Sequence, residues 1–360
     1  MLRIIHAADF HLDSPFAALE EEKAALRRKE QRQLLEDLAD QAVGADLVLL
    51  AGDLLDSGVC HAETWEALED FLNSLPGQVF IAPGNHDYYA PESPWDRMTL
   101  RENVHLFTSP QPEPVLLPSL DCTVWGAAFV SPRSGPKLRG FRASAEGGVQ
   151  LMVLHGDVNA RGMGYDPIAE EEIAGSALRY LALGHVHACS GLRRSGDTLW
   201  AYPGCLMGRG FDETGEKGFL RLELTEEGCD GEFIPLPGRR YERREADVTG
   251  KESLLSALEE ALPPADRENI LRLILRGEWP EKPRLEALYQ TLADRCFQLE
   301  LRDETRLQRS IWDDAGEDTL RGCFLRVLRK KYDAADEAER GRITLAARYG
   351  LAALDYREEL

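Results

Sequence analysis

Residues 79–89 read VFIAPGNHDYY, and this stretch ends in a way that is unusual for a strand. Its first three residues form a short apolar run, which is typical of a buried strand. The run breaks at a Pro-Gly pair, and Asn85, His86 and Asp87 follow directly. An amide, an imidazole and a carboxylate therefore leave one turn, which predicts polar chemistry at the end of this strand.

Strand-like and helix-like segments alternate around this stretch. Apolar runs typical of buried strands lie at 2–8, 46–52 and 78–84, and residues 19–43 and 63–75 between them have helical spacing. This alternation predicts a mainly parallel α/β arrangement. Five later runs are also strand-like: 123–129, 149–156, 179–187, 198–204 and 218–224. They have little helix between them, so we expect a second sheet or a sandwich.

The length and the Pro-Gly pattern predict more than one domain. A chain of 360 residues is too long for one ordinary core. Pro and Gly cluster at 235–240, which indicates a boundary there. We therefore expect an α/β domain at 1–240, a small α/β capping domain at 241–303 and a C-terminal helical segment at 304–360.

The composition is typical of a folded cytoplasmic protein. Hydrophobic residues make up 43% and charged residues 29% of the chain. The seven cysteines contain no C-x-x-C pair, which favours reduced thiols, and no apolar run is long enough to span a membrane. The formal net charge of −21 is unfavourable for a nucleic-acid binder. Bound cations would offset part of this charge if some of the acids are metal ligands.

Five of the strand-like segments end in side chains that are able to bind a metal. A single histidine at a strand end is usually structural, and an Asp after Gly is ordinary turn chemistry. The joint pattern is different, because the carboxyl ends of strands in an α/β sheet meet at one crevice. Asp-x-His and His-x-His also place both side chains on one face. The candidate ligands are Asp9, His11, Asp53, Asn85, His155, His185 and His187.

The ligand types indicate which metal this site would bind. Carboxylates, imidazoles and one amide without thiolates suit manganese or iron better than a structural zinc. Seven ligands are too many for one tetrahedral centre, but they suit two ions about 3.5–4 Å apart that share a carboxylate and activate a water. His86 is then free to stabilise charge on the phosphate or to protonate the leaving oxygen. Asp87 either orients His86 or caps the following turn.

The motifs in this order resemble the calcineurin-like metallophosphoesterases. They are Asp9-x-His11, Gly52-Asp53, Gly84-Asn85-His86-Asp87, His155-Gly156 and Gly184-His185-x-His187. The resemblance implies a four-layer αββα sandwich and two metal sites bridged by Asp53, with His86 as the catalytic imidazole. By the same resemblance, one metal is held by Asp9, His11 and His187, and the other by Asn85, His155 and His185.

Within that family, the first 240 residues resemble the SbcD-type DNA repair nucleases, which work with an SbcC-like coiled-coil ABC-type ATPase. Cys205 replaces a serine of the SbcD pattern, and with Asp13 this departure resembles the YhaO-like branch. The resemblance implies a homodimer, for which we expect the segments 63–75 and 93–102 to form the interface. The remainder of the chain resembles these proteins only in layout.

DNA contacts, if present, are expected from a few basic residues. The loop 131–142 carries four cations and no acid, although it is equally well read as a solvated loop. Two further arginines lie in Gly-rich loops near the metal motifs. The candidate substrate-binding residues are Arg133, Lys137, Arg139, Arg142, Arg161 and Arg209. A second basic cluster lies at 239–244.

The sequence therefore predicts a two-metal phosphodiesterase that hydrolyses DNA as an exonuclease or endonuclease in repair. Manganese is the expected metal, with iron or magnesium as alternatives. A phosphodiesterase or phosphatase for small molecules or phosphoproteins is the alternative function. A third reading is a binding module that regulates an ATPase without catalysis. The helices of 304–360 either bind the ATPase or pack on their own domain.

Overall fold

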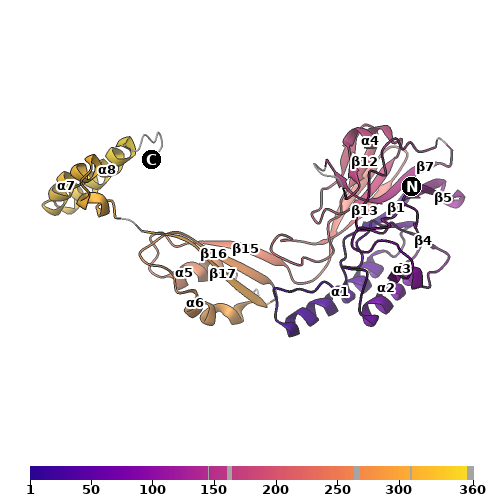
Figure 1. Cartoon of the computed structure of the whole chain (residues 1–360), viewed down its shortest axis with the longest axis horizontal. Helices are drawn as coiled ribbons and strands as arrows, with labels where there is room; N and C mark the ends of the chain where they lie inside the picture. Colours follow the sequence, from indigo (N-terminus) through magenta and orange to yellow (C-terminus); the bar gives the residue numbers. More distant parts are fainter. Residues whose placement is uncertain (145, 160–163, 263–267, 309, 355–360) are drawn as a thin grey trace. The chain divides into compact units, whose positions relative to one another are not determined.

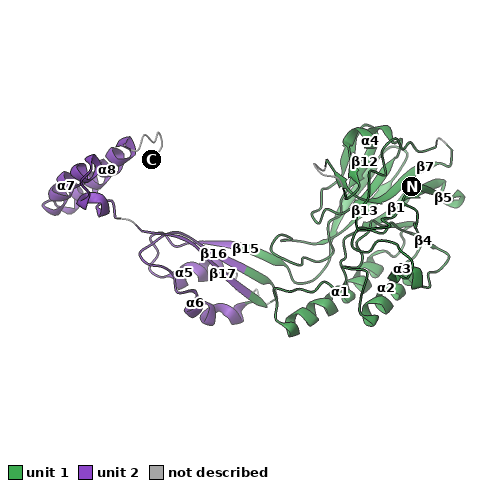
Figure 2. Ribbon diagram, viewed as in Figure 1, with its two compact units in different colours: residues 1–243, 267–271, 296–298 green, residues 244–266, 272–295, 299–360 purple. Residues whose placement is uncertain are grey.

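The computed structural model describes residues 1–144, 146–159, 164–262, 268–308 and 310–354. It divides into two compact units, coloured separately in Figure 2. Unit 1 comprises residues 1–243, 267–271 and 296–298, and unit 2 comprises residues 244–266, 272–295 and 299–360. The three-part division expected from the sequence remains a prediction.

The first sheet of unit 1 has six strands (Figure 1). These are β1 (Leu2–Ala7), β2 (Leu47–Leu50), β3 (Gln78–Ile81), β4 (Val104–Leu106), β13 (Gly218–Leu224) and β14 (Cys229–Pro235). Their order is β14-β13-β1-β2-β3-β4. β1 to β4 are parallel, whereas β13 and β14 add antiparallel strands at one edge. The carboxyl ends of β1, β2 and β3 therefore lie side by side.

The second sheet also has six strands. These are β5 (Glu113–Leu117), β6 (Cys122–Gly126), β7 (Val149–His155), β10 (Tyr180–Gly184), β11 (Arg193–Ser195) and β12 (Thr198–Ala201). Their order is β11-β12-β10-β7-β6-β5, with a parallel centre and antiparallel edges. The short strands β8 (Asp157–Val158) and β9 (Pro167–Ile168) form a separate pair. The second sheet expected from the sequence is present.

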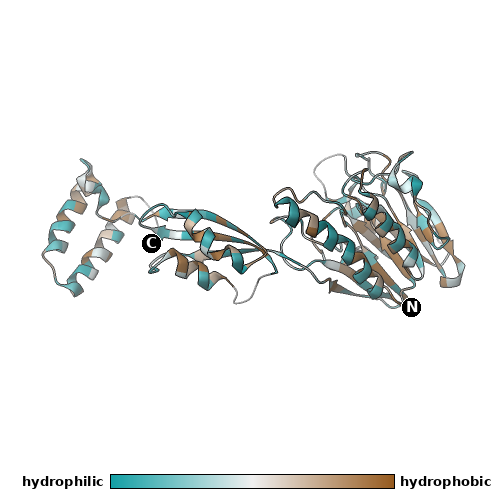
Figure 3. Cartoon of the chain, turned by 90° about the horizontal axis from the view of Figure 1, so that it is seen from below, coloured by the Kyte–Doolittle hydropathy of each residue, from teal (hydrophilic) through white to brown (hydrophobic). Residues whose placement is uncertain are grey.

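Helices cover both sheets. They are α1 (Glu21–Gln41), α2 (Ala62–Ser74), α3 (Pro94–Arg97) and α4 (Glu170–Gly175), with a 3-10 turn at Pro118–Leu120. The buried residues of α1 recur at helical spacing, from Ala24 through Gln31 to Leu38. In Figure 3 polar residues, in teal, are frequent on the helices, whereas the strands carry many apolar residues, in brown.

Three apolar cores show that unit 1 has four layers. In β2, Val48 and Leu50 pack with residues of α1 and α2, whereas Leu47 and Leu49 pack in a core to which both sheets contribute. β7 alternates in the same way between this central core and a third core that includes Ile173 of α4. Successive strand residues point to opposite faces, so each sheet is buried on both sides. The architecture is a four-layer α/β sandwich.

Unit 2 contains most of a three-stranded sheet and two pairs of helices. The strands are β15 (Tyr241–Asp247), β16 (Ile270–Trp279) and β17 (Gln298–Leu307), in that order. The helices are α5 (Leu254–Ala261), α6 (Leu285–Leu292), α7 (Leu320–Asp333) and α8 (Glu337–Leu354), with 3-10 turns at Ala293–Arg295 and Asp313–Gly316. Helices α7 and α8 pack together, with Gly350 against the ring of Phe324.

One expectation about these elements needs correction. Strand β17 continues to Leu307, so the helical pattern does not begin at 304. The segment 93–102, whose place at a dimer interface stays a prediction, contains the helix Pro94–Arg97. This short helix buries Trp95, whose Nε1 donates to the carbonyl oxygen of Asp87 at 2.5 Å. The segment thus supports the turn of the opening stretch.

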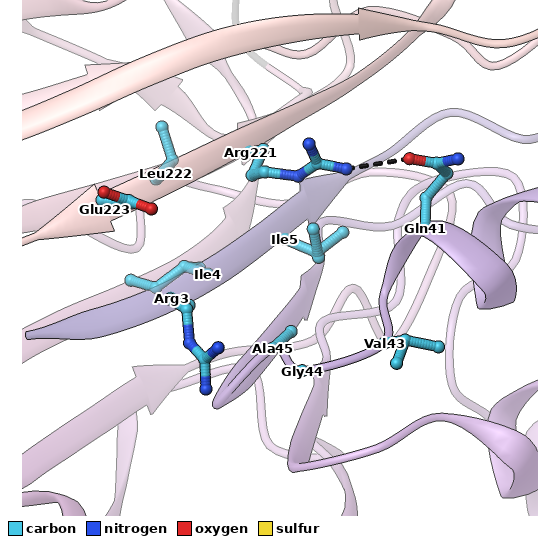
Figure 4. Close-up of a pocket in the computed structure, with 10 residues that line it drawn as sticks. All are labelled: Arg3, Ile4, Ile5, Gln41, Val43, Gly44, Ala45, Arg221, Leu222 and Glu223. Carbon is cyan, nitrogen blue, oxygen red and sulfur yellow. Dashed lines mark hydrogen bonds between the residues drawn. The ribbon is translucent and has the colours of Figure 1, made fainter.

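A small pocket lies at the start of β1, at the opposite end of the strand from its ligand-bearing loop (Figure 4). Residues of β1, β13 and the loop after α1 line it. Within it, the guanidinium of Arg221 donates to Oε1 of Gln41 at 2.8 Å. The pocket is separate from the cluster of polar side chains described next.

Candidate metal centre

The candidate ligands follow strands of both sheets. Several of them have positive φ angles, a backbone conformation that non-glycine residues rarely adopt. Asp9 follows β1, Asp53 follows β2 and His185 follows β10. The φ angles of Asp9, His11, Asp53 and His185 are 55°, 46°, 53° and 104°. Non-glycine residues in this region cost about 1–3 kcal/mol each and gather at functional sites. The strained backbone thus marks this set of loops as a functional site.

Two glycines allow these loops to approach each other. A side chain at Gly84 would collide with the carboxylate and backbone nitrogen of Asp53. A side chain at Gly184 would collide with the backbone oxygen of Ala51. Glycine is therefore required at the Gly-Asn-His-Asp turn and before His185 because of close packing.

Three of the ligands meet on one side of the centre. The Nε2 atoms of His11 and His187 lie 3.2 Å apart, and Nε2 of His187 lies 4.0 Å from Oδ1 of Asp9. One ligand atom from each of the three residues lies within 4.8 Å of the others. We call Asp9, His11 and His187 the first half-site.

Asp53 connects this group to a second one. Its Oδ2 lies 3.7 Å from Nε2 of His11 and 3.3 Å from Nε2 of His155. Oδ1 of Asn85 lies 3.1 Å from the same His155 nitrogen. The ring of His185 lies against that of His155, with centroids 5.2 Å apart. We call Asn85, His155 and His185 the second half-site, with Asp53 between the two.

Three imidazoles of the centre have an oxygen close to Nδ1. Nδ1 of His155 lies 2.9 Å from the carbonyl oxygen of Ala51. Nδ1 of His187 lies 2.6 Å from Oε1 of Glu213, and Nδ1 of His11 lies 3.2 Å from Oδ1 of Asp56. Nδ1–H of His155 and of His187 faces an oxygen, so the Nε2 lone pair of each faces the centre, whereas Nδ1 of His11 lies near Asp56 without a hydrogen bond to it. This is the arrangement that a histidine needs to bind a metal.

His86 lies beside the cluster and is exposed. Its backbone N–H donates to Oδ1 of Asp53 at 2.9 Å, and its ring packs edge-on against that of His11. Nδ1 of His86 lies 2.9 Å from the carbonyl oxygen of Asp56. Of the two roles left open for Asp87, that of orienting His86 is therefore wrong, because a backbone carbonyl orients His86 instead.

Asp87 has a structural task in the turn. Its buried carboxylate accepts hydrogen bonds from the backbone N–H groups of Gly84, Asp53 and Leu54 at 2.7, 3.2 and 2.7 Å. Burial raises the pKa of Asp87 to about 6 in spite of these donors. Asp87 thus joins the loop after β3 to the loop after β2.

The charges of the centre are strongly coupled. Burial raises the pKa of Asp9 to about 7, and burial lowers the pKa values of His11 and His185 to about 4. Burial disfavours charge on His155 as well, but the Asp53 carboxylate raises the pKa of His155 to about 9. Buried carboxylates thus face two imidazoles, those of His11 and His185, that bind protons poorly, and a divalent cation is able to supply the missing positive charge.

Comparison with known proteins fits this geometry. Residues 2–189, more than half of the chain, match the family model for calcineurin-like phosphoesterases. The chain belongs to this family. Members of the family are metal-dependent phosphoesterases that bind divalent ions.

Two relatives extend the match beyond these residues. The chain is 28% identical over 332 residues to "Uncharacterized metallophosphoesterase YhaO" of Bacillus subtilis (strain 168), covering 86% of this chain and 80% of the relative. It is 25% identical over 281 residues to "DNA double-strand break repair protein Mre11" of Aeropyrum pernix, covering 73% of this chain and 68% of the relative.

Four of the basic residues expected at the substrate surface of this metallophosphoesterase make other contacts. Lys137 is buried, with Nζ 3.5 Å from Oδ2 of Asp166. Arg139 lies 3.5 Å from Glu172, and Arg142 donates to the carbonyl oxygen of Gly175 at 3.1 Å. Arg209 pairs with Asp56 and Glu213. The expected substrate contact is therefore corrected for Lys137, which is buried, and for Arg209, whose guanidinium is bound by two carboxylates, while it stays a prediction for Arg139 and Arg142.

The two remaining basic candidates are Arg133 and Arg161. Arg133 is exposed, and among the described residues no ion pair involves it. Arg161 lies outside the described residues.

Among the described helices, none is both long enough and apolar enough to cross a membrane.

Sequence reasoning missed three residues near the centre. Asp56 and Glu213 contact the ligand histidines, and Tyr165 stacks on His185 with ring centroids 5.3 Å apart. Asp56 follows Asp53 by three positions in the Gly-Asp-Leu-Leu-Asp run, which is a local signal. Glu213 and Tyr165 had no such signal, because their contacts depend on how distant loops fold.

Proposed function

We propose that this metallophosphoesterase is a two-metal phosphodiesterase that hydrolyses DNA. The observation that carries the proposal is the position of Asp53, whose carboxylate lies between His11 and His155 and hence between the two half-sites. A carboxylate in this position is suited to bridge two divalent ions. A single metal site would not need ligands on both sides of it.

The donor set fits two such ions. Asp9, His11 and His187 would hold one ion, while Asn85, His155 and His185 would hold the other, and Asp53 would bridge them. Oxygen and imidazole donors without a thiolate favour manganese, with iron or magnesium as alternatives. When bound, the pair of ions would polarise the phosphate and lower the pKa of a water molecule.

His86 supplies the proton chemistry that this reaction needs. Nδ1–H donates to the carbonyl oxygen of Asp56, so Nε2 is left to face the substrate. A protonated Nε2 stabilises negative charge on the phosphate and then donates its proton to the leaving oxygen. The exposure of His86 allows it to reach a bound phosphodiester.

Nucleic acid is favoured as substrate by an aromatic side chain beside the centre. The ring of Tyr165 stacks on His185, and 46% of the residue is exposed. An exposed aromatic ring offers a surface on which a base stacks. Ser134 forms β-bridges with Gly164 and Tyr165, so the exposed Arg133 is the sequence neighbour of a residue whose backbone pairs with Tyr165. The similarity to a protein named for double-strand break repair supports the same substrate.

We further propose that the chain acts in the cytoplasm in DNA repair, as a dimer and together with an SbcC-like coiled-coil ABC-type ATPase. The resemblance to SbcD-type nucleases is the support for this partner. The helix pair α7 and α8 is the proposed contact, and the division into three parts is retained, with its second boundary moved from 303 to the end of β17 at Leu307. With a net charge of −21, the isolated chain should bind DNA weakly, and the ATPase would supply much of the affinity.

A second function is favoured by the charge. The strongly acidic chain and the small number of exposed cations among the described candidates suit a phosphodiesterase or phosphatase for small molecules or phosphoproteins. Such an enzyme would need few phosphate contacts beyond the metal ions.

One assay separates these functions. The full chain with Mn²⁺ is given labelled duplex DNA, single-stranded DNA and bis-p-nitrophenyl phosphate. Cleavage of DNA is expected, and cleavage of the small ester alone would favour the second function. Bound metals without any cleavage would favour a regulatory module.

A second experiment measures DNA binding by the isolated chain across a salt series. The affinity should be low and should weaken steeply with salt, and tight binding independent of salt would contradict this expectation.

A further inference from the structure

We propose that Arg209 is a positioning residue that holds both histidines of the first half-site. The proposal rests on the two-metal function proposed above and adds a residue outside the ligand set. It predicts that one metal site depends on Arg209 and that the other does not.

The guanidinium of Arg209 joins two carboxylates that are far apart in the sequence. Its Nη1 donates to Oδ1 of Asp56 at 3.0 Å, and its Nη2 donates to Oε1 of Glu213 at 2.8 Å. The Nε and backbone N–H of Arg209 both reach Oε2 of Glu213, at 3.3 and 2.8 Å. A planar guanidinium is suited to bridge two carboxylates, whereas a lysine offers a single point charge.

Each of these carboxylates meets one imidazole of the first half-site. Oδ1 of Asp56 lies 3.2 Å from Nδ1 of His11, and Oε1 of Glu213 lies 2.6 Å from Nδ1 of His187. The Nη2 of Arg209 also lies 3.0 Å from that His187 nitrogen. The shorter contact to the carboxylate places the proton on Nδ1, which leaves Nε2 to face the centre. One guanidinium therefore holds both carboxylates, of which Glu213 is hydrogen-bonded to His187 and Asp56 lies in electrostatic contact with His11.

The second half-site is oriented differently. Nδ1 of His155 faces the carbonyl oxygen of Ala51, a backbone group that no side-chain substitution removes. Arg209 therefore acts on one half-site alone.

The segment that carries Arg209 is itself fixed. Arg27 of α1 is fully buried, and its Nη2 donates to the carbonyl oxygen of Gly208 at 3.1 Å. The side chain of Arg209 is only 20% exposed, and its donors are occupied by Asp56 and Glu213. These contacts favour a supporting role over direct contact with a phosphate.

The test is a Mn²⁺ titration of the metal-free full chain by calorimetry, with wild type beside Arg209→Gln. Wild type should bind two ions. In Arg209→Gln one of the two affinities should fall by about tenfold or more, the usual effect of losing a residue that orients a metal ligand, and the other should stay unchanged. The matched control is Arg221→Gln in the pocket of Figure 4, which should bind both ions as wild type does.

A second pair of variants covers the case in which Arg209→Gln does not fold, as judged by circular dichroism of the metal-free chain. Glu213→Gln retains an oxygen that accepts from Nδ1–H of His187, whereas Glu213→Leu does not. The ion of the first half-site should therefore be lost in Glu213→Leu and largely kept in Glu213→Gln. Equal titrations for these two variants would contradict the proposal.

Other outcomes also decide the question. Two ions bound by folded Arg209→Gln with wild-type affinities would overturn the proposal, and a raised KM for bis-p-nitrophenyl phosphate in that variant would assign Arg209 to the substrate instead. Equal weakening of both ions would also overturn it. The titration uses no DNA. A wild type that binds two ions but leaves DNA intact would therefore refute the proposed substrate without affecting the proposed positioning role of Arg209.

Discussion

The imidazole of His86 is oriented by the backbone of Asp56, because its Nδ1 lies 2.9 Å from the Asp56 carbonyl oxygen. The same residue uses its carboxylate to contact His11 of the metal centre. Asp56 thus lies between the proton donor and the first half-site. One ligand atom of His86 also lies within 4.8 Å of ligand atoms of His11 and Asp53, so proton donation and metal binding by His86 have to be separated by experiment.

His86→Gln should separate metal binding from turnover. The variant should bind Mn²⁺ as wild type does, while kcat for bis-p-nitrophenyl phosphate should fall by about 10²–10⁴-fold, the usual contribution of a general acid. Calorimetry and steady-state kinetics measure the two effects. Loss of metal together with activity would instead make His86 a ligand.

Asp53→Ala should remove both ions. Its carboxylate lies 3.7 Å from His11 Nε2 and 3.3 Å from His155 Nε2, and it accepts the backbone N–H of His86. Without it, each half-site loses a ligand and the two ions repel each other unscreened. We expect no Mn²⁺ binding in the range where wild type saturates. Retention of one ion at wild-type affinity would show that Asp53 belongs to a single site.

Lys137→Met should destabilise the fold. Lys137 lies over the ring of Phe129 and is paired with Asp166 in the interior, where burial lowers the pKa of Lys137 and raises that of Asp166. Removing one member of a buried ion pair costs about 3–5 kcal/mol, because the other charge stays buried. Urea unfolding measures the change. The exposed Lys29→Met should shift the unfolding free energy by no more than about 0.5 kcal/mol, and equal effects would refute the buried pair.

Stability should fall below pH 6.5 because of His6. Burial lowers the pKa of His6 from 6.5 to about 3. The neutral ring is fully bonded, since Nε2–H donates to the carbonyl oxygen of Leu183 and Nδ1 accepts from the hydroxyl of Tyr180. Between these pH values the unfolded chain holds one more proton than the folded chain. The contribution of His6 is therefore complete above pH 6.5 and is lost towards pH 3.

The loss of the His6 contribution below pH 6.5 gives the unfolding free energy a measurable slope against pH. One proton corresponds to about 1.4 kcal/mol of unfolding free energy per pH unit. Urea unfolding of wild type and His6→Gln between pH 7.5 and pH 5 should show a shallower slope for the variant. Parallel slopes for wild type and His6→Gln would contradict the assignment.

Tyr165→Leu should distinguish a nucleic-acid substrate from a small ester. Stacking on an aromatic ring contributes about 1–3 kcal/mol per base, so KM for single-stranded DNA should rise roughly 5- to 150-fold. KM for bis-p-nitrophenyl phosphate, which carries no base, should change much less. Equal changes for both substrates would indicate that Tyr165 only supports His185.

Much of the fold and the set of candidate ligands could be predicted from local sequence. Buried strands leave apolar runs, and a ligand that follows such a run is placed at the sheet edge by the strand itself. Asp9, Asp53 and His155 were predicted to converge for this reason, and the structure brings them within 4.8 Å of one another. The two sheets of unit 1 likewise followed from the alternation of segments.

The remaining contacts depend on loops that approach through the tertiary fold. Glu213 lies 26 positions after His187, and Asp166 lies 29 positions after Lys137. A loop rich in basic residues therefore looked like a substrate surface, although Asp166 draws Lys137 inside. Asp87 follows His86 in the sequence, yet the extended turn directs its carboxylate to backbone N–H groups instead.

The most direct test of the two-ion centre is an anomalous difference map from crystals of the full chain grown with Mn²⁺. The account predicts two peaks about 3.5–4 Å apart, one on either side of the Asp53 carboxylate. A single peak, or peaks that do not share Asp53, would contradict it.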